Sequence, residues 1–387
     1  MTVKPGNPFW AYGLVAFGML GNGCVNHELL SVDAIKIIHA DERLPEDELL
    51  DVGVIVFDPA IPESEKVQEK DYIFPAVRKA ESRFFPYNLR TTLQGTGNWG
   101  VVRVLPDRSK AVDLLVSGKI LSSDGELLQV HIQAQDNTGR VWLEKEYSQR
   151  ASRFAYTEAN TKGIEPFQDL YDTISNDLLE ARSQFSAKDI LSIRKIAELR
   201  YAADLAPPAF DSYLDHEDGI YSLTRLPSQN DPMMNRIYRI RSTEHTFIET
   251  LDEHYSIYCG SIRRSYQSWR KYSYEEASAL RELRSEGRTR TIIGAATALL
   301  GGTDLLKSGL EMRDESDIHA DVLRELSESL EPEIDPFTLE LEGRAVTLGG
   351  SIETQYEQWR SLLSDIYATE TGMNWRNTST YEGIRAN

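Results

Sequence analysis

Residues 128–135, Leu-Gln-Val-His-Ile-Gln-Ala-Gln, decide the fold class of this chain, because apolar and polar side chains alternate at every step. Such alternation predicts a β-strand with one buried face and one wet face. The stretch 112–121 before it ends in Ser-Ser-Asp-Gly (122–125), and the stretch 141–147 after it follows Asp-Asn-Thr-Gly (136–139). Turn sequences of this kind join antiparallel strands. The sequence therefore predicts a three-stranded antiparallel meander.

A βαβ unit is expected on the amino-terminal side of the meander. Residues 51–58 form a continuous apolar run, which is typical of a strand buried on both faces, and residues 100–106 form a second one. Between them, apolar side chains recur about every fourth residue and predict an amphipathic helix, which Pro86 should kink or restart. A helix from about Glu165 to Ala203 should cover the sheet. The fold class is therefore predicted as α+β, with a mixed amino-terminal sheet.

The carboxyl-terminal half has a helical pattern. After a Pro- and Asp-rich stretch to Pro232, expected to be a loop with short turns, apolar residues from 237 to 280 step by threes and fours. The stripe has a gap at Glu244 and slips after Tyr272, so we expect the long helix to end or bend near Ser273, or to break at Gly260. A hairpin around Glu342-Gly343 and one more helix should follow.

These elements suggest where the chain divides. A typical domain has roughly 100 to 200 residues, so 387 residues favour more than one domain. The expected segments are a signal peptide (1–23), a tether (24–47), an α+β domain (48–205), a helical domain (206–335), a ββα unit (336–372) and a tail (373–387).

The first residues have the order of an export signal. Lys4 precedes an apolar run from Phe9 to Leu20, and small residues lead to Cys24. About a dozen apolar residues are too few to span a bilayer, which needs about 20. The segment resembles a bacterial lipoprotein signal, although Asn22 and the lack of an aliphatic residue three before Cys24 depart from the usual pattern. A buried cysteine at the start of a soluble domain is the alternative interpretation.

The lipoprotein resemblance implies a location. Cys24 would become the diacylated first residue of the mature chain, and Val25 after it implies transfer to the outer membrane, with the body in the periplasm. Several acyl chains give stable attachment, since each buried methylene contributes about 0.8 kcal/mol. We expect the lipid bilayer to be one partner, through acylated Cys24.

Composition limits the other partners. The net charge is −19, and nucleic acids or anionic headgroups require clustered Lys and Arg, so nucleic-acid binding is not expected. The second cysteine, Cys259, would be left without a disulfide partner, and the helical pattern around it favours burial.

The amino-terminal α+β pattern, with its strand Leu-Val-Ser-Gly-Lys-Ile (115–120), resembles the amino-terminal domain of TolB and the periplasmic domains of CsgG-like and PelC-like lipoproteins. The strand end Val-Thr-Leu-Gly-Gly-Ser (346–351) resembles half of a BON module. The first resemblance covers about a hundred residues and implies oligomers or scaffolds of the envelope that do no covalent chemistry.

No motif for catalysis or for a cofactor is visible, and we expect neither. The best enzymatic alternative is a metal site of His245, Glu249 and Glu253, at four-residue steps along one helix face, with His254 beside them. An acidic, exposed helix face gives the same spacing.

The run 291–302, Thr-Ile-Ile-Gly-Ala-Ala-Thr-Ala-Leu-Leu-Gly-Gly, is the most apolar one after Cys24 and follows a basic cluster. It is too short to span a membrane. It is either a helix packed within its domain or a patch that meets a membrane or another subunit. The residues of such a patch would be Ile292, Ile293, Leu299 and Leu300.

Together these features predict a non-enzymatic outer-membrane lipoprotein that serves as a periplasmic scaffold for assembly, secretion or surface-polymer handling. Its protein partners would be further copies of itself or other envelope proteins. The alternatives are a periplasmic metal-dependent hydrolase and a sensor that binds a ligand between the first two domains.

Overall fold

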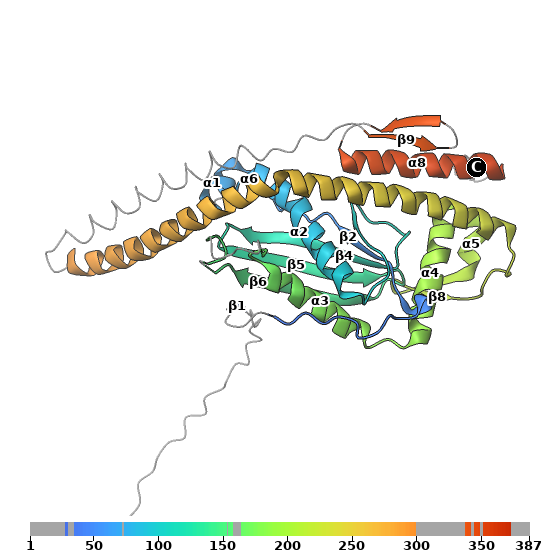
Figure 1. The fold of residues 1–387 in the computed structure, drawn as a ribbon, viewed down its shortest axis with the longest axis horizontal. Helices are drawn as coiled ribbons and strands as arrows, with labels where there is room; N and C mark the ends of the chain where they lie inside the picture. Colours follow the sequence, from blue (N-terminus) through green and yellow to red (C-terminus); the bar gives the residue numbers. More distant parts are fainter. Residues whose placement is uncertain are drawn as a thin grey trace, which may run out of the picture.

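The computed structural model describes residues 28–29, 35–71, 73–152, 154–157, 164–298, 337–341, 344–348 and 351–372, and the fold is α+β as predicted (Figure 1). A six-stranded mixed sheet has the order β1-β6-β5-β4-β2-β3. Its strands are β1 (Glu28–Leu29), β2 (Val52–Ile55), β3 (Val102–Leu105), β4 (Leu114–Ser123), β5 (Leu127–Asp136) and β6 (Val141–Arg150).

The predicted meander and the predicted βαβ unit are both present in this sheet. Strands β4, β5 and β6 pair antiparallel, and Ile120 lies opposite Val130. Strand β2 pairs parallel to β3, with helix α2 between them in the chain. The sequence did not indicate that β2 also pairs parallel to β4, which places it inside the sheet.

The proline inside α2 (Pro75–Thr96) does not interrupt this helix, so the expected restart at Pro86 is wrong. A proline lacks the N–H that would bond the carbonyl four residues before it, here that of Ser82. The Ser82 carbonyl instead accepts a hydrogen bond from the backbone N–H of Phe57, at 2.9 Å. The sheet therefore satisfies the carbonyl that Pro86 leaves free.

A short helix, α1 (Glu65–Asp71), precedes α2.

The helix expected from about 165 to 203 is two helices, α3 (Gln168–Arg182) and α4 (Ala187–Leu205). The second begins at a capping box, in which the Ser186 hydroxyl accepts from the backbone of Asp189 and the Asp189 carboxylate accepts from Ser186. The Ser-x-x-Asp spacing is a sequence signal for this start. Helices α2 and α3 pack on the sheet, whereas α4 packs at its end (Figure 1).

The stretch expected to be a loop contains more structure than predicted. Helix α5 (Pro207–Phe210) and the 3-10 turn η2 (Asp211–Tyr213) lead into a hairpin of β7 (Leu214–Glu217) and β8 (Ile220–Leu223). Both residues of its two-residue turn, Asp218 and Gly219, have positive φ. Asp-Gly is a strong hairpin signal, because a tight turn of this type needs two left-handed residues.

Helix α6 (Pro232–Ala298) is one unbroken helix of 67 residues, so an end near Ser273 and a break at Gly260 are both wrong. The buried face does not slip after Trp269. It continues through two polar residues, fully buried Arg270 and buried Ser273, whose hydroxyl donates to the Asp124 carbonyl at 2.9 Å. The apolar pattern missed this continuation because the side chains that carry it are polar.

Arg270 links α6 to the segment before α3. It forms a two-pronged ion pair with Glu165, in the loop before α3, and its guanidinium lies 4.6 Å from the Tyr266 ring centroid. A buried arginine is stable only when its charge is paired, and here the pairing partner comes from a distant segment.

The first half of α6 covers the edge strand β3. The Asp252 carboxylate accepts a hydrogen bond from the backbone N–H of Val104 at 2.8 Å, and Arg103 pairs with Glu249 at 2.5 Å. An uncovered edge strand leaves its N–H groups unpaired and invites aggregation. Helix α6 therefore covers this edge of the sheet and satisfies a backbone N–H of β3.

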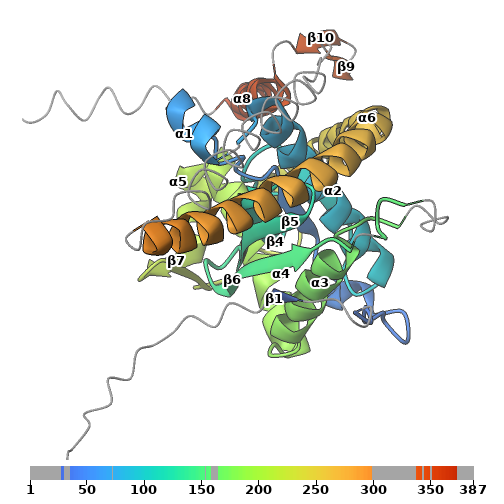
Figure 2. The same ribbon diagram turned by 90° about the vertical axis from the view of Figure 1, so that its left-hand side faces the viewer.

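The carboxyl-terminal ββα unit has the predicted elements, β9 (Phe337–Leu341), β10 (Arg344–Leu348) and α8 (Ile352–Thr371). In both views α6 lies between the sheet and α8 (Figures 1 and 2). The gap in the apolar stripe at Glu244 lies against α8. This carboxylate is 2% exposed and accepts from the hydroxyls of Tyr356 and Ser109.

The hydrophobic core crosses the boundary expected near residue 206. One cluster joins the sheet, α2 and α3 to Cys259, Tyr266 and Trp269 of α6. A second cluster joins Val104 and Leu105 of β3 to α4, α6 and α8. Cys259 is a buried free thiol whose pKa burial raises to about 12. The sheet and the long helix therefore share their interior.

Candidate functional site

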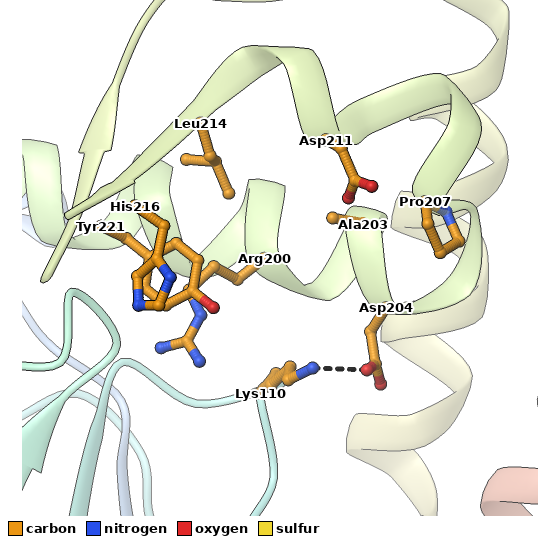
Figure 3. A pocket seen from close by; sticks show the side chains of 9 residues that line it. All are labelled: Lys110, Arg200, Ala203, Asp204, Pro207, Asp211, Leu214, His216 and Tyr221. Atoms are coloured by element: carbon orange, nitrogen blue, oxygen red, sulfur yellow. Dashed lines mark hydrogen bonds and ion pairs between the residues drawn. The ribbon is translucent and has the colours of Figure 1, made fainter. Parts of the chain in front are cut away.

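A cleft of about 410 Å³ opens where α4 meets the β7–β8 hairpin (Figure 3). It lies between the segment predicted as the first domain and the hairpin that follows it. Its walls come from α4, α5, η2, the hairpin and the β3–β4 loop. The lining residues are Lys110, Arg200, Ala203, Asp204, Pro207, Asp211, Leu214, His216 and Tyr221.

A glycine contact holds the hairpin in place beside the sheet. Gly139, in the β5–β6 turn, has a φ of +95°, and a Cβ there would collide with the Gly219 carbonyl in the β7–β8 turn. The backbone N–H of Tyr221 donates to the Thr138 carbonyl at 2.7 Å. Gly139 therefore serves twice, since it adopts a left-handed conformation and lets two turns touch.

Three flat side chains stack along one wall of the cleft. His216 and Tyr221 face each other across the hairpin, with ring centroids 4.1 Å apart and planes 20° from parallel. The guanidinium carbon of Arg200 lies 4.0 Å from the Tyr221 ring centroid, a cation–π contact (Figure 3). Stacking of this kind restricts the rotation of all three side chains and so pre-forms the wall.

Arg200 carries a positive charge that no carboxylate of the described residues neutralises at ion-pair distance, within 4.0 Å. Its Nη1 donates to the carbonyl of Asn137, at 2.6 Å, and to the Asn137 side-chain oxygen. Burial lowers the pKa of Arg200 from its ordinary value, with Tyr221 and Asp204 acting in the opposite direction. Arginine nevertheless stays protonated in proteins.

One turn further along α4 from Arg200, one carboxylate is shared by two cations. Asp204, at the end of α4, forms ion pairs with Lys110 from the β3–β4 loop and with Arg360 from α8, the latter at 2.7 Å. Figure 3 shows the Lys110 side chain reaching across to Asp204. Asp204 is half-buried and has these two cations as its ion-pair partners, while the second aspartate of the lining, Asp211, is exposed.

A second feature is the solvent-exposed face of α6, opposite the side that packs on the sheet, which we call the α6 face and define by Ile257, Arg263, Arg264, Lys271 and Tyr272. Ile257 is 62% exposed and Tyr272 is 52% exposed, and the three basic residues are also exposed. Figure 1 shows α6 continuing past the end of the sheet.

The structure does not bring the residues of the predicted metal site together. Nε2 of His245 lies 2.9 Å from the Ala111 carbonyl, so this side chain faces inward, and burial lowers its pKa. Glu249 pairs with Arg103, and Glu253 is exposed. Within the described part of the chain, no three His, Cys, Asp or Glu residues are placed to hold a metal ion.

The other predicted site residues either lie outside the described residues or have side chains that the structure does not describe. Cys24 is outside the described residues, as are Leu299 and Leu300. Ile292 and Ile293 belong to the helical backbone of α6, but their side chains are not described. No described helix has the length and apolarity to cross a bilayer.

Sequence patterns alone missed the cleft residues Arg200, His216 and Tyr221. Arg200 lies within a helix that contains several other charged residues, so its sequence position does not single it out. The Asp218-Gly219 turn was the sequence signal that His216 and Tyr221 face each other. Comparison with protein families, with curated proteins and with solved structures finds no match for this chain. The resemblance to envelope lipoproteins therefore stays a prediction.

Proposed function

We propose that this chain is a non-enzymatic lipoprotein of the bacterial outer membrane, attached through acylated Cys24, and that it works as a periplasmic scaffold by self-association through the α6 face. The observation that carries the scaffold role is the exposure of Ile257 and Tyr272 on a helix whose opposite face is buried. Their spacing along α6 is roughly 22 Å, so in this proposal the two side chains are separate apolar contacts of one extended interface.

Charge supports a second copy of the chain as the partner. The α6 face presents three basic residues, Arg263, Arg264 and Lys271, on a protein whose net charge is −19. Exposed Glu253 and Glu275 lie on the same side of the helix, so this face offers charges of both signs to a second copy. Complementary charges favour encounter and orient two surfaces, while the apolar side chains supply burial.

The attachment is supported by the sequence around Cys24, which has an apolar run before it and small residues next to it. The test is mass spectrometry of protein isolated from bacterial membranes, for the wild type and for Cys24→Ala. We expect the wild type to begin with an acylated Cys24 and the variant to leave the membrane fraction. An intact Met1 in the wild type would contradict the lipoprotein assignment.

Self-association is tested separately, by sedimentation velocity of the Cys24→Ala chain in solution. We expect an oligomer that the double substitution Ile257→Asp and Tyr272→Asp converts to a monomer, because burying two added carboxylates is costly. Leu191→Asp is the matched control, since Leu191 is an apolar residue of α4 with 39% exposure. A monomeric parent chain, or an oligomer that both variants leave intact, would overturn the scaffold mechanism.

A further inference from the structure

We propose that the cleft between α4 and the β7–β8 hairpin binds a small hydroxylated carboxylate of one- or two-sugar size, the chemistry of a uronic acid. This binding is separate from self-association, because the cleft and the α6 face share no residue. It gives the scaffold a ligand that would contact α4, the β3–β4 loop and the hairpin together.

The carboxylate is assigned to Arg200. A guanidinium has five N–H donors in a planar fork that matches the two oxygens of a carboxylate. The bonds to Asn137 use only Nη1, and the side chain is held in place by its stacking on Tyr221. In a protein of net charge −19, an arginine that is pre-oriented but has no carboxylate of the described residues within 4.0 Å is suited to an external anion.

Lys110 can assist without leaving a charge unpaired. Asp204 already has Arg360 of α8 as a second cation, at 2.7 Å. Lys110 can therefore turn from Asp204 toward a bound carboxylate, while the Asp204 charge stays compensated. Lys110 and Arg200 both line the cleft, which allows both cations to approach the same ligand (Figure 3).

The remaining lining suits the hydroxylated body of the ligand. Asp204 and Asp211 offer carboxylate oxygens, which accept hydrogen bonds from hydroxyl groups. Leu214, Ala203 and Pro207 provide the apolar surface on which a sugar ring can rest. A volume of about 410 Å³ lies at the small end of ligand sites, which run from about 300 to 1,000 Å³. A ligand of one or two rings fits this size.

The inference is tested by isothermal titration calorimetry of the full Cys24→Ala chain with sodium glucuronate, in a phosphate-free buffer of low ionic strength. Glucose, which lacks the carboxylate, and acetate, which lacks the ring hydroxyls, are the ligand controls. We expect glucuronate to bind at millimolar concentration or below, and both controls to bind roughly tenfold more weakly, since each loses one class of contact.

Two substitutions should act in opposite directions. Arg200→Gln removes the carboxylate partner and should weaken glucuronate binding roughly tenfold or more. Asp211→Asn removes a like charge from the exposed rim and should strengthen it, by an amount that shrinks as salt is added. Arg194→Gln is the control for the first, because Arg194 lies on α4 but bonds the Glu46 carbonyl, outside the cleft lining.

Absence of glucuronate binding at millimolar concentration would overturn the proposal, as would equal binding of glucose or an unchanged affinity in Arg200→Gln. Binding of inorganic phosphate without binding of glucuronate would overturn the assignment of a carboxylate. If Arg200→Gln fails to fold, Asp211→Asn decides, since its exposed side chain leaves the fold intact: an affinity that does not rise would refute the charge argument. Sedimentation velocity of the same samples measures self-association directly. A failure of glucuronate binding can therefore be distinguished from a failure of the scaffold mechanism.

Discussion

Asp113 is a single side chain whose burial makes the stability of this protein depend on pH. It is 3% exposed at the start of the meander, accepts a hydrogen bond from the backbone N–H of Asp51 at 2.9 Å, and lies 3.9 Å from Arg241. Burial raises its pKa from 3.8 to about 6, although Arg241 and the hydrogen bond act in the opposite direction. Folding therefore favours the protonated carboxyl.

The raised pKa of Asp113 makes the free energy of unfolding fall as pH rises. Because the folded pKa lies above the unfolded value, the stabilisation is fully present below pH 3.8 and is lost as pH rises through 6. A rise from 3.8 to about 6 corresponds to about 3 kcal/mol. We expect Asp113→Asn, which cannot ionise, to gain about that much relative to the wild type between pH 4 and pH 7.5, as measured by urea unfolding.

Asp211→Asn is the control for this measurement, because it makes the same chemical change at an exposed aspartate. Parallel profiles for the wild type and Asp113→Asn would show that the buried carboxyl does not carry the effect.

Among the elements, α6 departs most from what its sequence pattern suggested. Gly260 lies inside this helix on an exposed face, and a Cβ added there would meet nothing within 4 Å. Glycine in a helix interior costs about 0.5–1 kcal/mol relative to alanine. Gly260→Ala should therefore raise the free energy of unfolding by about this amount, as measured by denaturant titration.

Gly139→Ala, in the β5–β6 turn, is the contrasting glycine variant. Its positive φ and its contact with Gly219 predict a loss of stability and a displaced hairpin. If Gly260→Ala were instead destabilising, α6 would not be a continuous helix at that position.

For the whole molecule, the shared cores predict one cooperative unit. Cys259, Tyr266 and Trp269 of α6 belong to the same cluster as the sheet, and Asp252 satisfies a backbone N–H of β3. We expect the full chain to unfold in one transition and a fragment ending at residue 205 to lack a cooperative transition, because it would expose this core and the β3 edge. Circular dichroism during urea unfolding measures both. A fragment with a sharp transition would instead support an independent domain that ends near residue 206.

Local patterns in the sequence determined the elements of this protein. Alternation in 128–135 and the turns beside it specify the meander, and the apolar steps from 237 onward specify a long helix. Period and turn chemistry are properties of neighbouring residues, so they can be recognised without a structure. The Asp218-Gly219 hairpin and the Ser186 capping box were equally local and could have been predicted.

Tertiary structure alone decided which distant groups meet. The Ser82 carbonyl accepts a hydrogen bond from Phe57, and the Asp252 carboxylate accepts one from the edge strand β3. Arg200 makes its cation–π contact with Tyr221. It also decided that α6 stays unbroken, since Arg270 and Ser273 are polar and become part of the buried face only through Glu165 and the Asp124 carbonyl. The physical reason is that burial of a polar group depends on a partner that satisfies it, and no pattern within one element identifies that partner.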